Sequence, residues 1–424
     1  MIPYKRHTLS NGLTVAVNRD RQSKLAAVNI LYKVGARNED PARTGFAHLF
    51  EHLMFRGTRD VPDFDLPVQM ACGDNNAFTN NDYTDFYITL PKDNIETALW
   101  LEADRMTGLD ISPEALETEK RVVIEEYKQR YLNQPYGDQG MLLRSLAYTL
   151  HPYRWATIGL TPDHVARATI DEVRAFYLRW YHPSNAILSV SADIDEERVF
   201  ELAERYFAPI AYTPSAAGPL PAGADRAAEP FPPAVTTPHV AVPHAGAVQS
   251  SIRIGRLLFG RNHPDYVGMQ VVAMLLGGYF GSRLMQNLRE ANGFTYGVVA
   301  AMVNLEREGY LAVATQVARD ATEQALAEIY REIERLRTEP VAEEELSLVR
   351  NMMTGEMMRI LDGPFGIADV TIENILCGRR NDVVSENLQR IRAITPAEVQ
   401  RLAVKYLPRE ALVTVVAGGP ESVL

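Results

Sequence analysis

The chain has 424 residues, which is too long for one ordinary core and suits two domains of roughly 200 residues each. Hydrophobic residues make up 46% and charged residues 23% of the sequence, as in a globular protein and unlike a disordered or fibrous one. The formal net charge of -11 argues against a nucleic-acid partner, because phosphate binding needs a surplus of Lys and Arg on some face.

The sequence shows no sign of a membrane segment. No apolar run approaches the roughly 20 residues needed to span a bilayer, and no apolar signal region follows Met1. We therefore expect a soluble, cytoplasmic protein without a membrane partner, although a periplasmic protein that has lost its signal peptide would read the same. Cys72 and Cys377 sit in no metal-ligand spacing, and free thiols in a reducing compartment are favoured over a lone disulfide.

Strands and helices alternate along the first half of the chain. Asn11-Gly12 is a hairpin-turn signal between two predicted strands at 5–9 and 13–18. Further strands are predicted at 26–34, 86–90 and 186–190. Apolar residues at helical spacing predict helices at 45–55, 95–106, 113–131 and 171–181.

One stretch breaks this alternation. Residues 208–238 hold eight prolines among many alanines, a composition typical of a semi-rigid, extended linker rather than of a packed element. We therefore predict two domains, 1–207 and 239–424, joined by a Pro/Ala-rich linker at 208–238.

The pattern of the first half returns after this linker. The segment Ile-Asp-Glu-Val, which ends at Val173, is matched by Ile-Thr-Pro-Ala-Glu-Val, which ends at Val399, 226 residues later. The helix predicted to begin at Pro113 has a counterpart at Pro340, at an offset of 227. A repeat of this length indicates a duplicated domain.

A short segment of the first copy has the residue pattern of a metal site. The segment from His48 to His52 reads His-Leu-Phe-Glu-His, and on a helix positions i and i+4 project from one face, so both imidazoles can reach one point. Glu51 borders the same face. Zinc in hydrolases commonly takes three protein ligands and leaves a fourth position for water, whose proton a neighbouring carboxylate accepts. Two histidines four apart on an apolar helix are, alternatively, ordinary core residues.

The third ligand is expected from the helix that begins at Pro113. Glu119 and Glu126 are seven residues apart and so share a face, whereas Glu125 is rotated away by roughly 100°. We therefore predict that Glu126 is a metal ligand and that Glu119 orients a ligand or the water. Glu125 stays open as the alternative ligand.

The second copy lacks these ionisable groups. The residues at the corresponding positions, offset by 226 or 227, are Met274, Gly277, Gly278 and Met353. If the histidines and glutamates were needed only to build the fold, the second copy would need similar residues. Its lack of them indicates that the first copy carries chemistry on a shared scaffold.

These motifs resemble the pitrilysin/insulinase family of inverted-zincin (HxxEH) metallopeptidases, particularly its bacterial processing-peptidase-like members. The resemblance covers nearly the whole chain. It includes the segment 45–55 with Gly57-Thr58 after it, Asn-Ala-Phe-Thr at 76–79, and Glu119-x6-Glu126. It implies an α+β fold of two duplicated α/β-sandwich domains, each a mostly antiparallel sheet with helices packed on it, which together form half of a clamshell.

The resemblance also implies roles for residues outside the metal site. Asn76, Ala77 and Phe78 would form an edge strand that binds the substrate backbone by strand addition. Arg289 and Tyr296, seven residues apart in the degenerate second copy, would contact the substrate and donate hydrogen bonds to the developing oxyanion.

The function implied is that of a zinc-dependent endopeptidase with one Zn²⁺ per chain. Its substrates would be unfolded peptides or small proteins that fit an enclosed chamber, with Glu51 as the base. Because the family's enzymes have four such domains, two chains are needed, and the presence of both residue sets favours a homodimer. The alternatives are the catalytic subunit of an obligate heterodimer with a related chain, and a non-catalytic assembly subunit.

Overall fold

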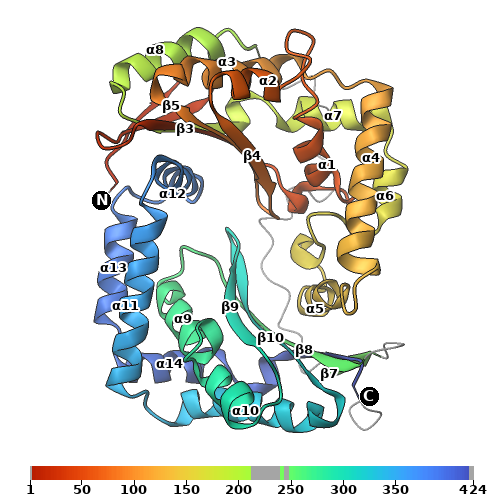
Figure 1. The fold of residues 1–424 in the computed structure, drawn as a ribbon, viewed down its shortest axis with the longest axis vertical. Coiled ribbons are helices and arrows are strands. Elements are labelled where there is room, and N and C mark those ends of the chain that lie inside the picture. The colour runs from red at the N-terminus through yellow and green to blue at the C-terminus, as the bar shows by residue number, and fades with distance from the viewer. Residues whose placement is uncertain (1, 212–238, 243–247, 420–424) are drawn as a thin grey trace. The chain divides into compact units, whose positions relative to one another are not determined.

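The computed structural model describes residues 2–211, 239–242 and 248–419, which form two compact units (Figure 1). Of the described residues, the first unit contains 2–127, 155–211 and 358–384. The second unit contains 128–154, 239–242, 248–357 and 385–419. Each unit therefore takes a short piece of chain from the opposite half of the sequence.

The first unit is built on a six-stranded, mostly antiparallel sheet with the strand order β1-β2-β6-β3-β5-β4. Its strands are β1 (Lys5–Thr8), β2 (Thr14–Arg19), β3 (Leu25–Tyr32), β4 (Asp74–Thr79), β5 (Thr84–Pro91) and β6 (Ala186–Ala192). The predicted hairpin joins β1 and β2, and the only parallel pair among the described strands of this sheet is β2 with β6. In β3 every residue after Leu25 is buried, because helices cover both faces of the sheet.

Most helices of this unit come from the first half of the sequence. They are α1 (Phe46–Leu53), α2 (Asp65–Met70), α3 (Ile95–Gly108), α4 (Pro113–Tyr127), α6 (Pro162–Ala166), α7 (Ile170–Trp180) and α8 (Glu196–Phe207). Helix α3 packs on β3 and β5, and α8 packs on β2 and α3. Thr169 caps α7 and Glu172 completes a capping box, which fixes where this helix begins.

The opposite face of the same sheet is covered by a helix from the second half of the sequence, α12 (Pro364–Leu376). Ile372 of α12 lies in a buried cluster with Leu31 and Ile187 of the sheet. The Tyr83 hydroxyl donates a hydrogen bond of 2.8 Å to Glu373, which fixes the position of α12.

The second unit repeats this architecture. Its five-stranded sheet has the order β7-β11-β8-β10-β9, formed by β7 (His239–Val242), β8 (Gln249–Phe259), β9 (Val298–Asn304), β10 (Glu308–Ala318) and β11 (Val413–Ala417). The pairing directions match those of β2-β6-β3-β5-β4, including one parallel pair, β7 with β11. This correspondence is what a duplicated sequence would produce.

Helices again cover both faces of this second sheet. One face packs on α9 (Tyr266–Ala273), α10 (Thr322–Thr338) and α14 (Pro396–Tyr406), and most of α11 (Glu343–Ile360) and α13 (Val383–Ala393) also belongs to this unit. The other face is covered by α5 (Gln139–Ala147), which comes from the first half of the sequence and packs on β8 and β11. The two halves thus exchange α5 and α12.

The predicted fold class, α+β with two mostly antiparallel sheets and helices packed on them, is confirmed. Residues 212–238 of the predicted linker lie outside the described residues, and the predicted domain boundaries stay a prediction. Both cysteines are free thiols. In the described part of the chain, no helix combines the length and apolar composition that crossing a bilayer requires.

Candidate metal centre

Helix α1 is fixed in the first unit by its apolar face. Phe46, Leu49, Phe50 and Leu53 are all buried, and the Phe50 ring stacks on Phe176 and Tyr181 with centroid distances of 5.2 and 5.0 Å. Aromatic pairs at such distances add specific attraction to their burial. The remaining face of α1, which carries the two histidines, packs against α4.

The start of α1 is determined by a glycine and a buried carboxyl group. Gly45 has φ +95, and a Cβ there would lie 2.8 Å from the Ile158 carbonyl oxygen, so only glycine fits. The Glu39 side chain accepts hydrogen bonds from the backbone N–H groups of Gly45 and Ala47, at 2.9 and 2.8 Å. Glu39 thereby replaces the cap that Gly45 cannot supply.

Burial raises the pKa of Glu39 to about 8, although its hydrogen bonds with Ala47 and Gly45 act in the opposite direction. The carboxyl group lies at the positive end of α1, where the helix dipole favours a negative charge. The start of α1 therefore depends on the buried carboxyl group of Glu39.

Helix α4 supplies the acidic residues. Its buried positions include Leu116, Glu119, Val123 and Tyr127, at the spacing of three and four residues that marks one helical face. The Tyr127 hydroxyl donates a hydrogen bond of 3.0 Å to the Leu160 carbonyl oxygen, which holds the end of the helix. Glu119 and Glu126, two turns apart, therefore both face α1.

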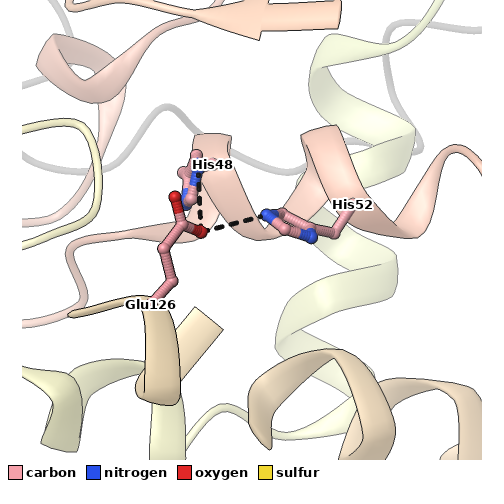
Figure 2. A group of neighbouring side chains, drawn as sticks. All are labelled: His48, His52 and Glu126. Carbon is pink, nitrogen blue, oxygen red and sulfur yellow. Dashed lines mark ion pairs between the residues drawn. The ribbon is translucent and has the colours of Figure 1, made fainter. Parts of the chain in front are cut away.

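Three of the predicted site residues lie close together in the structure. Figure 2 shows His48 and His52 of α1 pointing toward the Glu126 carboxylate, with all three ligand atoms within 4.8 Å of one another. Glu126 Oε2 lies 3.6 Å from His48 Nε2 and 3.4 Å from His52 Nε2. Among the described residues this is the only cluster of at least three His, Cys, Asp or Glu side chains with such spacing.

The donor set suits zinc. Zinc binds imidazole nitrogen and carboxylate oxygen at about 2.0–2.2 Å, so tetrahedral ligands lie roughly 3.3–3.6 Å from one another. The two distances from Glu126 Oε2 fall at this value. His48 is 6% exposed, so its ring is held by the surrounding core.

Glu119 contacts the other ring nitrogen of His52. Glu119 Oε2 lies 3.4 Å from His52 Nδ1, and Arg56 forms an ion pair with Glu119 Oε1. Burial lowers the pKa of His52, but hydrogen bonds and the negative charges of Glu119 and Glu126 outweigh it and raise the pKa to about 9. A carboxylate behind a metal-binding histidine fixes its orientation and increases its basicity.

The pKa of Glu119 itself is lowered. Burial acts to raise it, but the hydrogen bonds of His52 and Arg56 and the positive charge of Arg56 outweigh that effect. Glu119 is therefore ionised at neutral pH, as an orienting carboxylate must be. Arg56, Glu119 and His52 form one chain of polar contacts that ends at the cluster of His48, His52 and Glu126.

The structure also separates the two candidate third ligands. Glu125 is exposed and is absent from the cluster, whereas Glu126 belongs to it. Glu51 lies on α1 one residue before His52 and is half-buried. These positions agree with the helical geometry on which the sequence analysis relied.

Comparison with known proteins places the chain in a family. The model described as "Insulinase (Peptidase family M16)" matches residues 14–152, and the model described as "Peptidase M16 inactive domain" matches residues 167–353. The chain belongs to peptidase family M16. The first match contains the cluster of His48, His52 and Glu126 of this M16 protein, and the second contains Met274, Gly277 and Gly278 of the second copy.

Several relatives of this M16 chain are named as proteases. Zinc protease PqqE of Helicobacter pylori is 27% identical over 406 residues, which cover 94% of this chain and 89% of the relative. An uncharacterized zinc protease of Streptomyces coelicolor is 25% identical over 426 residues, which cover 97% of this chain and 89% of the relative.

Solved structures share the M16 fold of this chain. The crystal structure of a protease from Helicobacter pylori has a TM-score of 0.92 at 24% identity, over 98% of this chain and 100% of that one. A peptidase M16 inactive domain from Pseudomonas fluorescens has a TM-score of 0.84 at 18% identity, over 98% of each chain. A chain of complex III2 from Candida albicans has a TM-score of 0.78 at 18% identity, over 100% of this chain and 97% of that one.

The predicted substrate strand is β4, the last strand of the first sheet. Asn76, Ala77 and Phe78 pair with β5 on one side, and no described strand pairs with β4 on the other. Asn76 is exposed, and β4 contacts α1, so this edge passes the helix that carries the histidines.

Arg289 and Tyr296 belong to the second unit. The Arg289 guanidinium lies 4.7 Å from the centre of the Phe280 ring, a cation–π contact, and Tyr296 is 92% exposed. The catalytic role that the resemblance gives this pair stays a prediction.

Sequence reasoning did not single out Arg56 or Glu39. Arg56 stands four residues after His52, so the helical spacing that paired the histidines could have pointed to it. No local pattern could have identified Glu39, because its contact with α1 passes through an irregular segment with bends and turns.

Proposed function

We propose that this M16 protein is a zinc-dependent endopeptidase that hydrolyses unfolded peptides or small proteins. The observation that carries the proposal is the convergence of His48, His52 and Glu126, with ligand atoms within 4.8 Å of one another, beside Glu51 on the same helix. Relatives named as zinc proteases, which align over nearly the whole chain, support the same reading.

The residues of the first unit have different roles in this mechanism. His48, His52 and Glu126 would hold the zinc, and Glu119 orients the His52 ring. A zinc ion held there would polarise the scissile carbonyl and lower the pKa of a water molecule. The Glu51 carboxylate accepts the proton of the attacking water and delivers it to the departing amide nitrogen.

The edge of β4 gives the proposed substrate class. A peptide that adds to this edge forms main-chain hydrogen bonds, which are open to any unfolded chain regardless of its side chains. Because β4 contacts α1, a peptide bound along Asn76 and Ala77 would pass the metal-binding residues. A folded protein could not present a strand there without unfolding locally.

We also propose that the active form is a homodimer in which Arg289 and Tyr296 contribute to substrate binding. The chain carries both these residues and the metal-binding set, so two copies would give two equivalent sites. A guanidinium and a phenol are suitable donors to the developing oxyanion. The molar mass in solution tests this point, and a monomer that is fully active at the assay concentration would contradict it.

The deciding experiment is hydrolysis of an unstructured, quenched fluorescent peptide by the purified chain with zinc. The Glu51→Gln variant keeps both imidazoles and removes the base, so we expect a loss of roughly 10³-fold or more in kcat with zinc content unchanged. Glu125→Gln on the exposed side of α4 is the matched control, with the same loss of one charge.

The other outcomes separate the alternatives. If the wild-type chain holds zinc and cuts no peptide, it is the subunit of a heterodimer or a non-catalytic assembly subunit. If wild type and Glu51→Gln cut equally, the proposed mechanism is wrong.

A further inference from the structure

The second unit has a polar hollow beside Tyr296 that the proposed mechanism does not use. Its volume is about 310 Å³, at the low end of the range for ligand pockets. The residues that line it come from β8, from β10 and from the turn before β9, and those used below are Ser251, Arg253, Thr295, Tyr296 and Thr315.

A buried glutamine of α5 holds the Arg253 side chain in place. Gln139 of α5 is 1% exposed, and its Oε1 accepts a hydrogen bond of 3.2 Å from Arg253 Nε and one from the Ser251 hydroxyl. Its Nε2 donates to the carbonyl oxygens of Ser251 and Val415, at 2.7 and 3.1 Å. All four hydrogen-bonding positions of the amide are used, so the amide cannot turn away from Arg253.

The terminal nitrogens of the guanidinium are left for a ligand. Within the described residues, Arg253 forms no ion pair, and the only hydrogen bond from its side chain is the one to Gln139. Among the described residues that line the hollow there is no Asp or Glu. An uncompensated guanidinium is notable in a chain with a net charge of -11.

Tyr296 is presented on the same hollow by a fixed turn. The hydroxyls of Thr295 and Thr315 both donate to the Gly297 carbonyl oxygen at 2.9 Å, and Gly297 N–H donates back to Thr295 at 3.1 Å. These bonds fasten the turn to β10, while the Tyr296 side chain remains exposed. The hollow therefore offers a guanidinium and a phenol from two rigid supports.

We propose that this hollow is a substrate subsite that binds a carboxylate of the peptide, with Arg253 as the anchor. The two terminal nitrogens of this guanidinium can donate to the two oxygens of one carboxylate. This inference rests on the proposed function, because it assigns a preference for acidic peptides to the peptidase. The carboxylate comes either from an Asp or Glu side chain or from the peptide C-terminus.

Binding is measured by fluorescence anisotropy on the full-length Glu51→Gln chain with zinc, so that no peptide is consumed. Three labelled peptides differ only in one group: one contains Glu and is amidated at its C-terminus, the second has Gln in that place, and the third has Gln with a free C-terminal carboxylate. We expect a carboxylate-bearing peptide to bind more tightly than the neutral one by roughly tenfold, the value for a charge-assisted contact with partial solvent screening.

Substitutions of Arg253 test whether this preference for a carboxylate arises at the hollow. Arg253→Gln should remove it, and Arg253→Glu should reverse it in favour of a peptide with Lys in the Glu position. Arg331→Gln, an exposed arginine of α10 that lies outside the hollow, is the matched control and should keep the preference. Which of the two carboxylate peptides gains affinity identifies the source.

The outcomes also separate this inference from the proposed function. Suppose that wild type cuts peptides, but adding Arg253→Gln or Arg253→Glu to the Glu51→Gln chain leaves the relative affinities for the three peptides unchanged. The subsite is then refuted and the proposed peptidase function stands. If Glu51→Gln shows the Arg253-dependent preference although wild type cuts none of them, the subsite stands and the proposed function fails.

Discussion

Replacing Glu126 by Gln should weaken zinc binding by roughly 10²–10³-fold. Glu126 Oε2 lies 3.6 Å from His48 Nε2 and 3.4 Å from His52 Nε2, and it is the only carboxylate of the cluster. Protein zinc sites bind with about 10–16 kcal/mol at neutral pH, which is about 3–4 kcal/mol for each of three or four ligands. The loss of one ligand therefore corresponds to the factor given, since about 1.4 kcal/mol is tenfold.

The neighbouring residue provides the matched control. Glu125→Gln removes the same charge one residue earlier on α4, from a side chain that is exposed and outside the cluster. Zinc Kd is measured for both variants by competition with a chelating dye at fixed pH, with circular dichroism to check that α4 is retained. If Glu125→Gln weakens zinc binding as much as Glu126→Gln does, the assignment of the third ligand is wrong.

Three further predictions follow from other parts of the chain. Glu119→Gln keeps the shape of the side chain but removes the charge behind His52, so zinc Kd measured with the same dye should rise by roughly tenfold, and an unchanged Kd would contradict its orienting role. Gly45→Ala places a Cβ 2.8 Å from the Ile158 carbonyl oxygen at φ +95, and chemical denaturation should show a loss of about 2–3 kcal/mol in the free energy of unfolding. Asp265→Asn should destabilise the second unit by about 1–2 kcal/mol at neutral pH, and this difference should shrink as pH falls below about 4.

The sign of the last prediction follows from the contacts of Asp265. Burial raises the pKa of this carboxyl, but hydrogen bonds from Tyr406, Lys405 and Arg401, at 2.6, 3.0 and 2.9 Å, outweigh it and hold the pKa well below 3.8. A carboxyl with a depressed pKa stabilises the fold above its unfolded pKa and loses that contribution as pH falls through its folded pKa. Unfolding followed between about pH 2 and pH 7 measures the difference in the free energy of unfolding, and a gap that widens at low pH would contradict the assignment.

The parts of the site that depend on helical spacing could be predicted from the sequence. His52 follows His48 by four positions and Glu126 follows Glu119 by seven, and each spacing fixes a helical face without knowledge of the rest of the fold. The hairpin at Asn11-Gly12 was predictable for the same reason, because its turn chemistry is local.

The exchange of α5 and α12 could not be predicted from local patterns. Both helices follow long helices in equivalent places of the repeat, and nothing in their own residues states which sheet they cover. Arg253 was missed for a similar reason. Its significance depends on Gln139, more than a hundred residues earlier, and on the turn at Tyr296. Such contacts have no sequence period to reveal them.

The exchange of α5 and α12 has a consequence for synthesis on the ribosome. One face of the first sheet, with Leu31 and Ile187, stays uncovered until α12 at residues 364–376 has left the exit tunnel. Most of the chain must therefore be made before the first unit can complete its core. During that interval the uncovered sheet can form non-native contacts. Covering it requires closure of a loop of more than 150 residues between β6 and α12. We expect folding of the first unit to be largely post-translational and to depend on the second half of the chain.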